Sequence, residues 1–323
     1  MLRLNRLCLY LTLFTISSAL VQAFPAPDSS NPSPSGDKAA QELVRLAVAN
    51  EISAGNKGPT KVMYLSRKRS SQGFETKLNV ETTQATAAML IEQNNRPISN
   101  QQMRDETERL DKLSANPREL RRKQRQEEEE SDHTLRIMTA FPDAFLYQFD
   151  GTEPGTSGLG KAGDELVRLK FRPNPAYAPP SHVEQVLAGM QGELLIDKQA
   201  HRIARIDATL FKEVSFGWGI LGHLDKGGTF LVEQAEVAPN DWELTHTRLN
   251  FTGKVMMVKS LVIKSEETDC DFRTVPGNTT FTKGVELLKA EGARLQKQDV
   301  QKQDAQAQKK DEPARTAANQ GGR

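Results

Sequence analysis

The chain has 323 residues, with 43 basic and 42 acidic side chains, so its formal net charge is +1. This balance excludes binding to nucleic acid or anionic lipid through bulk positive charge, which needs a clear basic excess. Hydrophobic residues make up 37% of the sequence, and polar residues are concentrated in a few segments.

The first 23 residues have the three parts of a cleavable signal peptide. Arg3 and Arg6 precede an apolar run over 7–16, and Ala23 ends a small-residue cleavage site. The run is far shorter than the roughly 20 apolar residues of a membrane-spanning helix. We therefore expect cleavage near Ala23 and export to the periplasm or beyond, which leaves Cys270 as the only cysteine and no intramolecular disulfide.

The ordered domain is predicted to begin after a flexible arm. Four prolines among small polar residues over 24–36 predict that arm. Apolar residues at helical spacing then predict an amphipathic helix over 37–52. Strands are predicted at 62–67, 74–83 and 87–92, and the pair Asn94 and Asn95 predicts a turn.

Residues 99–132 form a highly charged segment with two predicted helix starts. Ser99 and Gln102 make a capping box, and Asn116 followed by Pro117 makes a second start. The segment therefore predicts two helices or one broken helix. Because it has few apolar residues, we interpret it as a solvated helical excursion on the surface; a docking element for a protein partner is the alternative.

The second half predicts short strands in direct succession, which is typical of antiparallel hairpins because parallel pairs need long crossovers. The predicted strands are 144–149, 165–171, 192–197, 202–210, 213–216, 229–237, 242–251 and 253–267. We expect a single β-rich domain over 37–290, with 99–132 as the helical excursion. Residues 291–323 have little to bury and predict a disordered tail.

The last predicted strand is apolar on both faces, which requires cover on both sides or an apolar cavity beside it. Met256 and Met257 suit a variable apolar ligand, although methionine is also common as core filler. The candidate cavity residues in this strand are Met256, Met257, Val258, Leu261 and Ile263.

Two aromatic residues complete the candidate apolar cavity. Tyr177 lies in a proline-rich extended segment, which we interpret as a rigid connection between strands or as a lid over the cavity. Trp218 is interpreted as core or rim packing, with stacking on a ligand as the alternative.

The sequence predicts no catalytic residue, cofactor or metal site. Gly217, Gly219 and Gly222 spell G-x-G-x-x-G, but a strand follows them where a nucleotide-binding unit needs a helix. The five histidines lack metal-ligand spacing. Cys270 lies between two aspartates, which disfavour a reactive thiolate. We therefore expect a protein that is not an enzyme.

Several motifs resemble those of known families. The runs Phe171-Arg172-Pro173-Asn174-Pro175, Gly189-Met190-Gln191-Gly192-Glu193, Phe216-Gly217-Trp218-Gly219 and Leu221-Gly222-His223-Leu224-Asp225 resemble a family of exported bacterial proteins of unassigned function, over about 37–272. The strand ending Ile196-Asp197-Lys198, followed by Ile203-Ala204-Arg205-Ile206-Asp207, is similar to the lipoprotein-carrier (LolA-like) half-barrel superfamily.

The second resemblance implies a fold and a function. The fold class is α+β and mainly antiparallel, with a strongly curved sheet or half-barrel and helices packed on its concave side around an apolar cavity. The expected function is a periplasmic carrier for a hydrophobic ligand, either a lipid or a lipoprotein acyl chain. An envelope protein-interaction or stress-sensing module is the alternative. Neither needs a membrane-spanning helix.

Overall fold

The computed structural model describes residues 37–56, 60–216, 222–256 and 259–318. The signal peptide and the flexible arm predicted for 1–36 lie outside these ranges and stay predictions. Within the described ranges, none of the helices combines the length and the apolar character needed to cross a membrane.

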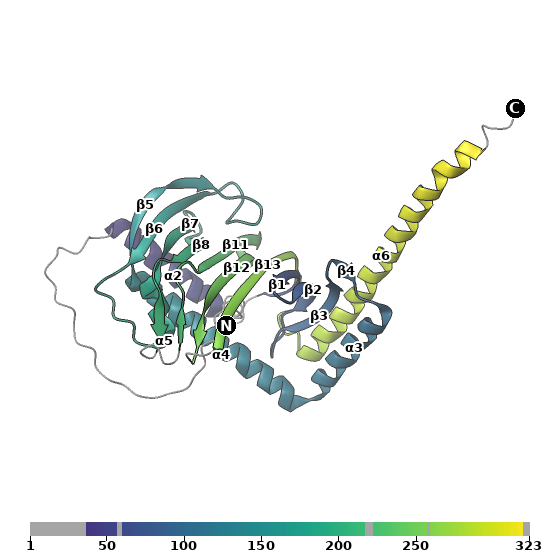
Figure 1. Ribbon diagram of the computed structural model, residues 1–323, viewed down its shortest axis with the longest axis horizontal. Helices are drawn as coiled ribbons and strands as arrows, with labels where there is room; N and C mark the ends of the chain where they lie inside the picture. Colours follow the sequence, from purple (N-terminus) through teal and green to yellow (C-terminus); the bar gives the residue numbers. More distant parts are fainter. Residues whose placement is uncertain (1–36, 57–59, 217–221, 257–258, 319–323) are drawn as a thin grey trace.

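Thirteen strands form one curved antiparallel sheet (Figure 1). Its strands are β1 (Lys61–Ser70), β2 (Gly73–Val80), β3 (Ala87–Gln93), β4 (Arg96–Pro97), β5 (Phe145–Pro154), β6 (Glu165–Pro173), β7 (Met190–Asp197), β8 (Arg202–Leu210), β9 (Val214–Phe216), β10 (Gly222–Leu224), β11 (Thr229–Ala238), β12 (Asp241–Val255) and β13 (Lys259–Val275). Their spatial order is β4-β3-β2-β1-β13-β12-β11-β8-β7-β6-β5, with the hairpin β9–β10 beside β12. The predicted fold class, α+β with mainly antiparallel strands, is confirmed.

The two edges of this sheet differ in length. β4 pairs with β3 only through Arg96 and Pro97. The turn before it has Asn94 and Asn95 at φ values of 52° and 61°, as two-residue hairpin turns require, so the predicted turn is confirmed. The opposite edge, β5, has 10 residues.

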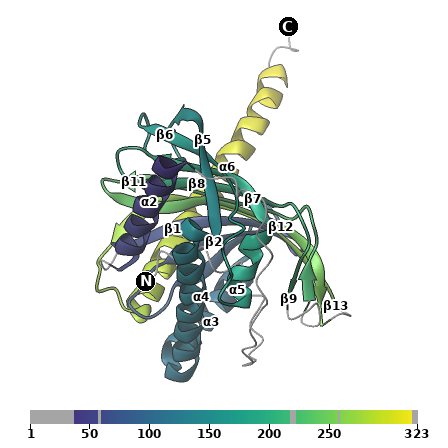
Figure 2. The same cartoon turned by 90° about the vertical axis from the view of Figure 1, so that its left-hand side faces the viewer.

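Helices cover both faces of the sheet. They are α2 (Lys38–Asn56), α3 (Asn100–Ala115), α4 (Pro117–Ala144), α5 (His182–Gln185), the 3-10 helix η2 (Val186–Gly189) and α6 (Phe281–Ala318). The concave side holds α2, α4 and α5, as predicted (Figures 1 and 2). The predicted amphipathic helix is confirmed in α2, because Ala40, Val44 and Ala47 are buried while Leu46 is exposed.

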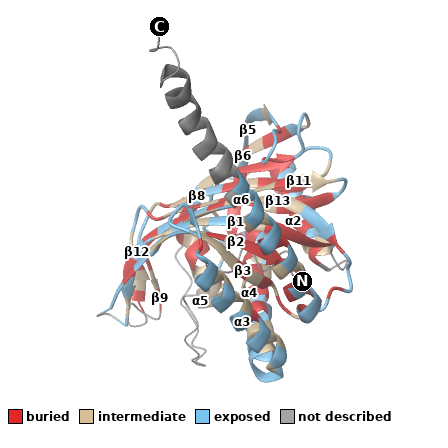
Figure 3. Ribbon diagram, turned by 90° about the vertical axis from the view of Figure 1, so that its right-hand side faces the viewer, coloured by how far each residue is buried: buried red, intermediate tan, exposed pale blue. Residues whose placement is uncertain are grey.

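Helices α3 and α6 pack on the opposite face of β1–β3, so helices are not confined to the concave side (Figure 3). Side chains alternate along β2, and Leu78 and Val80 face these two helices. They meet Leu110 of α3 and Phe281 of α6 in a second apolar cluster. The end of the sheet around β1–β3 is therefore buried from its convex side.

The charged segment 99–132 forms two helices, which was one of its two predicted alternatives. Ser99 and Gln102 form the predicted capping box, and the Asn116 side chain accepts hydrogen bonds from backbone N–H groups at the start of α4. Most side chains of the segment are exposed, as the interpretation as a solvated excursion expects, but the segment is also anchored to the domain. Leu110 is buried in the second apolar cluster, and α4 continues to Ala144 on the concave side.

The strand predicted over 253–267 is also wrong, because a hairpin turn divides it between β12 and β13. Val255 pairs with Lys259 at the end of the hairpin. Met256 has φ 50°, the left-handed region typical of turns, without a glycine or asparagine that would mark it. Val262 on β13 is 58% exposed, so this strand is not covered on both faces.

Helix α6 crosses the boundary predicted at residue 290 and continues to Ala318, so the tail does not begin at 291, and the disorder expected further along stays a prediction. Glu291 is buried, and hydrogen bonds from Arg294 and Arg273, both at 2.6 Å, lower its pKa to about 2. The glutamine, lysine and alanine of this segment are good helix formers. Helix propensity therefore lets α6 continue past residue 290, although this part of the chain has few apolar side chains to bury.

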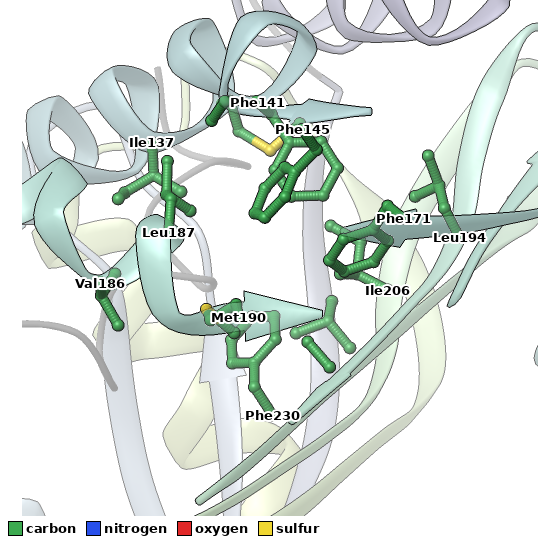
Figure 4. Close-up of a cluster of buried hydrophobic side chains, with 14 of the residues drawn as sticks. Ile137, Phe141, Phe145, Phe171, Val186, Leu187, Met190, Leu194, Ile206 and Phe230 are labelled. Carbon is green, nitrogen blue, oxygen red and sulfur yellow. The ribbon is translucent and has the colours of Figure 1, made fainter. Parts of the chain in front are cut away.

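An aromatic cluster joins α4 to β5 and β6. The ring of the fully buried Phe145 lies 5.0 Å from that of Phe141 and 4.7 Å from that of Phe171, between centroids. The Tyr147 hydroxyl donates a hydrogen bond to the Phe141 carbonyl at 2.7 Å, which satisfies an acceptor in the last turn of α4. Figure 4 shows the three phenylalanines nearly in contact, with Ile206 beside Phe171. The cluster therefore fixes α4 on the concave side.

We predict that Phe145→Ala lowers the free energy of unfolding by about 3–5 kcal/mol, because it removes a buried ring from the centre of this cluster. Phe149→Ala on the same strand is the matched control. Phe149 is 42% exposed, so its loss should change the stability by less than about 0.5 kcal/mol. Urea unfolding measures both, and equal losses would contradict a core role for the cluster.

The solvent-facing side of the sheet carries a network of ion pairs across its strands. The His246 ring contacts Glu233 through Nδ1 at 3.1 Å and Glu266 through Nε2 at 3.3 Å. Arg205 donates to Glu233 at 2.7 Å, and Arg248 lies 3.3 Å from Glu266. The hydrogen bond with Glu233, and then that with Glu266, raises the pKa of His246 because both favour its protonated form.

This arrangement predicts a pH-dependent contribution to stability. Since the pKa of His246 is higher in the folded chain than its unfolded value of about 6.5, the contribution is fully present below that pH. It is lost as the pH rises through the folded pKa. The stability difference between the wild type and His246→Gln should therefore be larger at acidic than at alkaline pH in urea unfolding. A difference that is constant or grows with pH would contradict the assignment.

Candidate functional site

The concave face of the sheet changes from apolar to charged along its length. Over β5–β8 and β11 it carries the main apolar core. Lys68 on β1 lies opposite Glu267 on one neighbouring strand, β13, and opposite Glu75 on the other, β2. Charges of opposite sign are thus cross-strand neighbours on this face. The charged and polar residues of this part of the face are Ser66, Lys68, Glu75, Lys77, Asn79, Glu267 and Asp269.

A groove of about 210 Å³ lies between this charged part of the sheet and α4. Lys123, Glu127 and Glu130 line it from the helix. The Glu127 carboxylate accepts a shared hydrogen bond from the Thr86 backbone N–H, at 3.0 and 3.2 Å to its two oxygens. The Lys123 ammonium lies 2.9 Å from the same carboxylate. The Thr86 N–H therefore ties the middle of α4 to the start of β3, and Lys123 holds the same carboxylate from within the helix.

The buried face of α4 changes character at the same place as the sheet below it. Glu127, Glu130 and Thr134 form its polar part, and Ile137 and Phe141 belong to the apolar part that follows. A polar stretch of helix thus lies over a polar stretch of sheet. Buried polar groups are stable only when they are hydrogen-bonded, so this matching is a requirement of the packing.

A smaller cavity, of about 60 Å³, lies beside the groove and nearer the apolar core. Met138 of α4, Ile206 of β8 and Val232 of β11 form its apolar wall. Leu244 of β12 lines both the cavity and the groove, so the two hollows meet at this side chain.

A buried ion pair closes the cavity on the side of α2. The Glu51 carboxylate accepts two hydrogen bonds from Arg202, at 2.7 and 2.8 Å. It also accepts the Ile203 backbone N–H at 2.9 Å and the Gln234 amide at 2.8 Å. The Arg202 guanidinium lies 5.3 Å from the centroid of the Trp242 ring. Bidentate geometry and added donors compensate the desolvation of this pair.

Burial shifts the pKa of two groups along the groove. Desolvation lowers the pKa of Lys68, and the nearby Lys77 ammonium lowers it further. Desolvation raises the pKa of the Glu130 carboxyl. Both shifts favour the neutral form of the side chain. The groove residues comprise three lysines and five carboxylates, which gives it an acidic excess.

The structure distributes the predicted cavity residues over several places. Leu261 is buried and Ile263 is half-buried against the main apolar core, and Tyr177 packs against the same core. The described residues that line the groove and the smaller cavity do not include these three. Met256 is 65% exposed at the β12–β13 turn. Met257, Val258 and Trp218 lie outside the described residues.

The charged groove was not predicted, because its residues look like those of a solvated surface. Lys68 and Lys77 lie in strands with several charged residues, and Glu127 lies in a long charged run. Composition does not distinguish buried members of such a run from exposed ones. The groove would be indicated by the pairing of β2, β1 and β13, which places charged residues opposite one another on neighbouring strands.

No family model and no curated protein matches the chain. Among solved structures, it is similar to the crystal structure of an outer membrane lipoprotein-sorting protein domain from Vibrio parahaemolyticus. The sequence identity is 9% and the TM-score is 0.29, and the match covers 77% of this chain and 99% of that chain.

We predict that Glu51→Ala lowers the free energy of unfolding by about 3–5 kcal/mol, because it leaves the Arg202 charge buried without its partner. Arg45→Ala on the same helix is the matched control. Arg45 pairs with Asp143 at 2.8 Å, and both side chains are more than half exposed. Its loss should change the stability by about 0–1 kcal/mol in the same thermal or urea unfolding experiment. Similar losses for both variants would contradict a special role for the buried pair.

Proposed function

We propose that this chain is a non-catalytic carrier that binds an amphipathic molecule, a lipid or the acyl chains of a lipoprotein, on the concave face of its sheet. The observation that carries the proposal is the change from an apolar to a charged surface beneath α4. A molecule with an acyl chain and a polar head needs both kinds of surface side by side.

The apolar end of this site would hold the acyl chain. Met138, Ile206, Val232 and Leu244 form its wall, and burial of a chain contributes about 0.8 kcal/mol per methylene. The polar head would lie in the charged groove. The acidic excess of the groove favours a head that carries an amine, because complementary charge discriminates between partners.

The ligand enters only when α4 moves. Ligand sites usually have volumes of about 300–1,000 Å³, whereas the cavity and the groove measure about 60 and 210 Å³. Separating the middle of α4 from the sheet breaks polar contacts such as that between Thr86 and Glu127, which water replaces at little net loss. The aromatic cluster at the other end of α4 stays packed and acts as the pivot.

The carrier acts outside the cytoplasm, in the periplasm or after secretion, where the signal peptide expected over 1–23 directs it. Its proposed function uses no cofactor. A second candidate is an envelope protein-interaction or stress-sensing module. The exposed apolar side chains of Met256 and Val262 at the β12–β13 hairpin favour this alternative, because exposed apolar groups suit contact with a protein partner.

Native mass spectrometry of the full chain, recovered from the periplasm and incubated with palmitoyl lysophosphatidylethanolamine, tests the carrier. We expect a one-to-one complex with the wild type. Leu244→Asp should weaken it at least about tenfold, because an ionised carboxylate in the apolar wall opposes burial of the chain. Leu46→Asp, on the exposed face of α2, is the matched control and should bind like the wild type.

Circular dichroism and thermal unfolding establish whether Leu244→Asp is folded. Lys77→Glu is a second variant that tests the polar end, since Lys77 is partly exposed on the groove floor and tolerates substitution. It should also change the affinity for the lysolipid. A wild type that stays free of lipid would overturn the carrier and favour the partner-binding module. Unchanged uptake by both groove variants would place the ligand elsewhere.

A further inference from the structure

Three potential metal ligands meet beside the β9–β10 hairpin, away from the groove under α4. Glu213 precedes β9, His223 lies in β10 and Asp225 follows β10. One ligand atom from each lies within 4.8 Å of the other two. The His223 Nε2 atom is 3.3 Å from Asp225 Oδ1.

The strand register explains why these residues meet. Val214 pairs with Leu224, and Ser215 pairs with His223, across the antiparallel hairpin. Side chains alternate along a strand. Val214 and Leu224 face the apolar core, so Glu213, His223 and Asp225 share the outer face. The hairpin thus brings Glu213 to the pair His223 and Asp225, which follow it by 10 and 12 residues in the sequence.

Hydroxyl groups outside the trio hold both carboxylates. The Thr252 hydroxyl on the neighbouring β12 donates to Asp225 Oδ2 at 2.6 Å, and the Ser215 hydroxyl donates to Glu213 Oε1 at 3.1 Å. Each carboxylate keeps its other oxygen for a ligand. Such second contacts orient metal-ligating side chains in metalloproteins.

We propose that Glu213, His223 and Asp225 bind one divalent metal ion of the zinc class. An imidazole with carboxylates favours zinc and its transition-metal neighbours, whereas calcium and magnesium favour oxygen ligands alone. Zinc bonds to these atoms are about 2.0–2.2 Å long, so a tetrahedral ion holds its ligand atoms about 3.3–3.6 Å apart. The His223–Asp225 contact already has this separation. A water molecule completes the fourth position.

This site was not predicted from the sequence, because the histidines lack the spacing of known zinc motifs. The strand pairing brings Glu213 to the neighbouring pair His223 and Asp225. The bound ion would tie the two strands of the hairpin together, and its binding free energy would add to the stability of that hairpin. The proposal is independent of the carrier function and of any ligand under α4.

Isothermal titration of the metal-free full chain with zinc chloride tests the proposal. The wild type should bind one equivalent. His223→Ala and Glu213→Gln should each weaken binding at least about tenfold, and Thr252→Val about 10- to 100-fold, because the hydroxyl that orients Asp225 is lost. Glu213 is exposed, so that variant is expected to fold normally even if His223→Ala does not.

Lys254→Ala is the matched control. Lys254 is directly opposite His223 in the β10–β12 pair and supplies a positive charge but no ligand. Its removal should leave zinc binding unchanged or stronger. A wild type that binds no zinc would overturn the proposal, and so would variants of Glu213 and His223 that bind zinc like the wild type.

Discussion

The direct passage from α4 into β5 is the constraint on which the rest of the molecule depends. Ala144 ends the helix and Phe145 begins the strand, with no loop between them. The helix must therefore turn back over the concave face of the sheet to which β5 belongs. The rings of Phe141 and Phe171 and the hydroxyl of Tyr147 fix that junction on its inner side. The groove and the smaller cavity are the spaces that this course of α4 leaves.

The polar middle of α4 and its apolar C-terminal part are held by different physical forces. The end near Phe141 is held by apolar burial, which is strong and non-directional. The stretch around Glu127 is held by the hydrogen bond from the Thr86 backbone N–H, whose net contribution is small because water competes for the same groups. Replacing such polar contacts with well-packed apolar residues often increases stability. The polar middle of α4 is therefore the part of this packing that is easiest to release.

The sequence predicted elements where pattern and packing agree. The strand over 202–210 was predicted with its observed bounds, because its alternation reflects one buried and one solvated face. The hairpin turn at Met256 was missed because its residues are apolar and carry no turn signal. The burial of Glu127 was missed because it depends on strands distant in sequence. The Glu213, His223 and Asp225 cluster was missed because it depends on the pairing of β9 with β10, and β10 was not among the predicted strands.

The unequal edges of the sheet determine how another chain could extend it. At one edge, β4 ends after two residues, and Pro97 has no N–H to offer a further strand. At the other edge, β5 presents a longer run of backbone, with the side chain of Phe149 exposed beside it. An added strand would therefore find more backbone at β5 than at β4. The Asp37 backbone N–H at the start of α2 already donates to the Tyr147 carbonyl of this strand at 2.9 Å, so α2 limits where on β5 an added strand could pair.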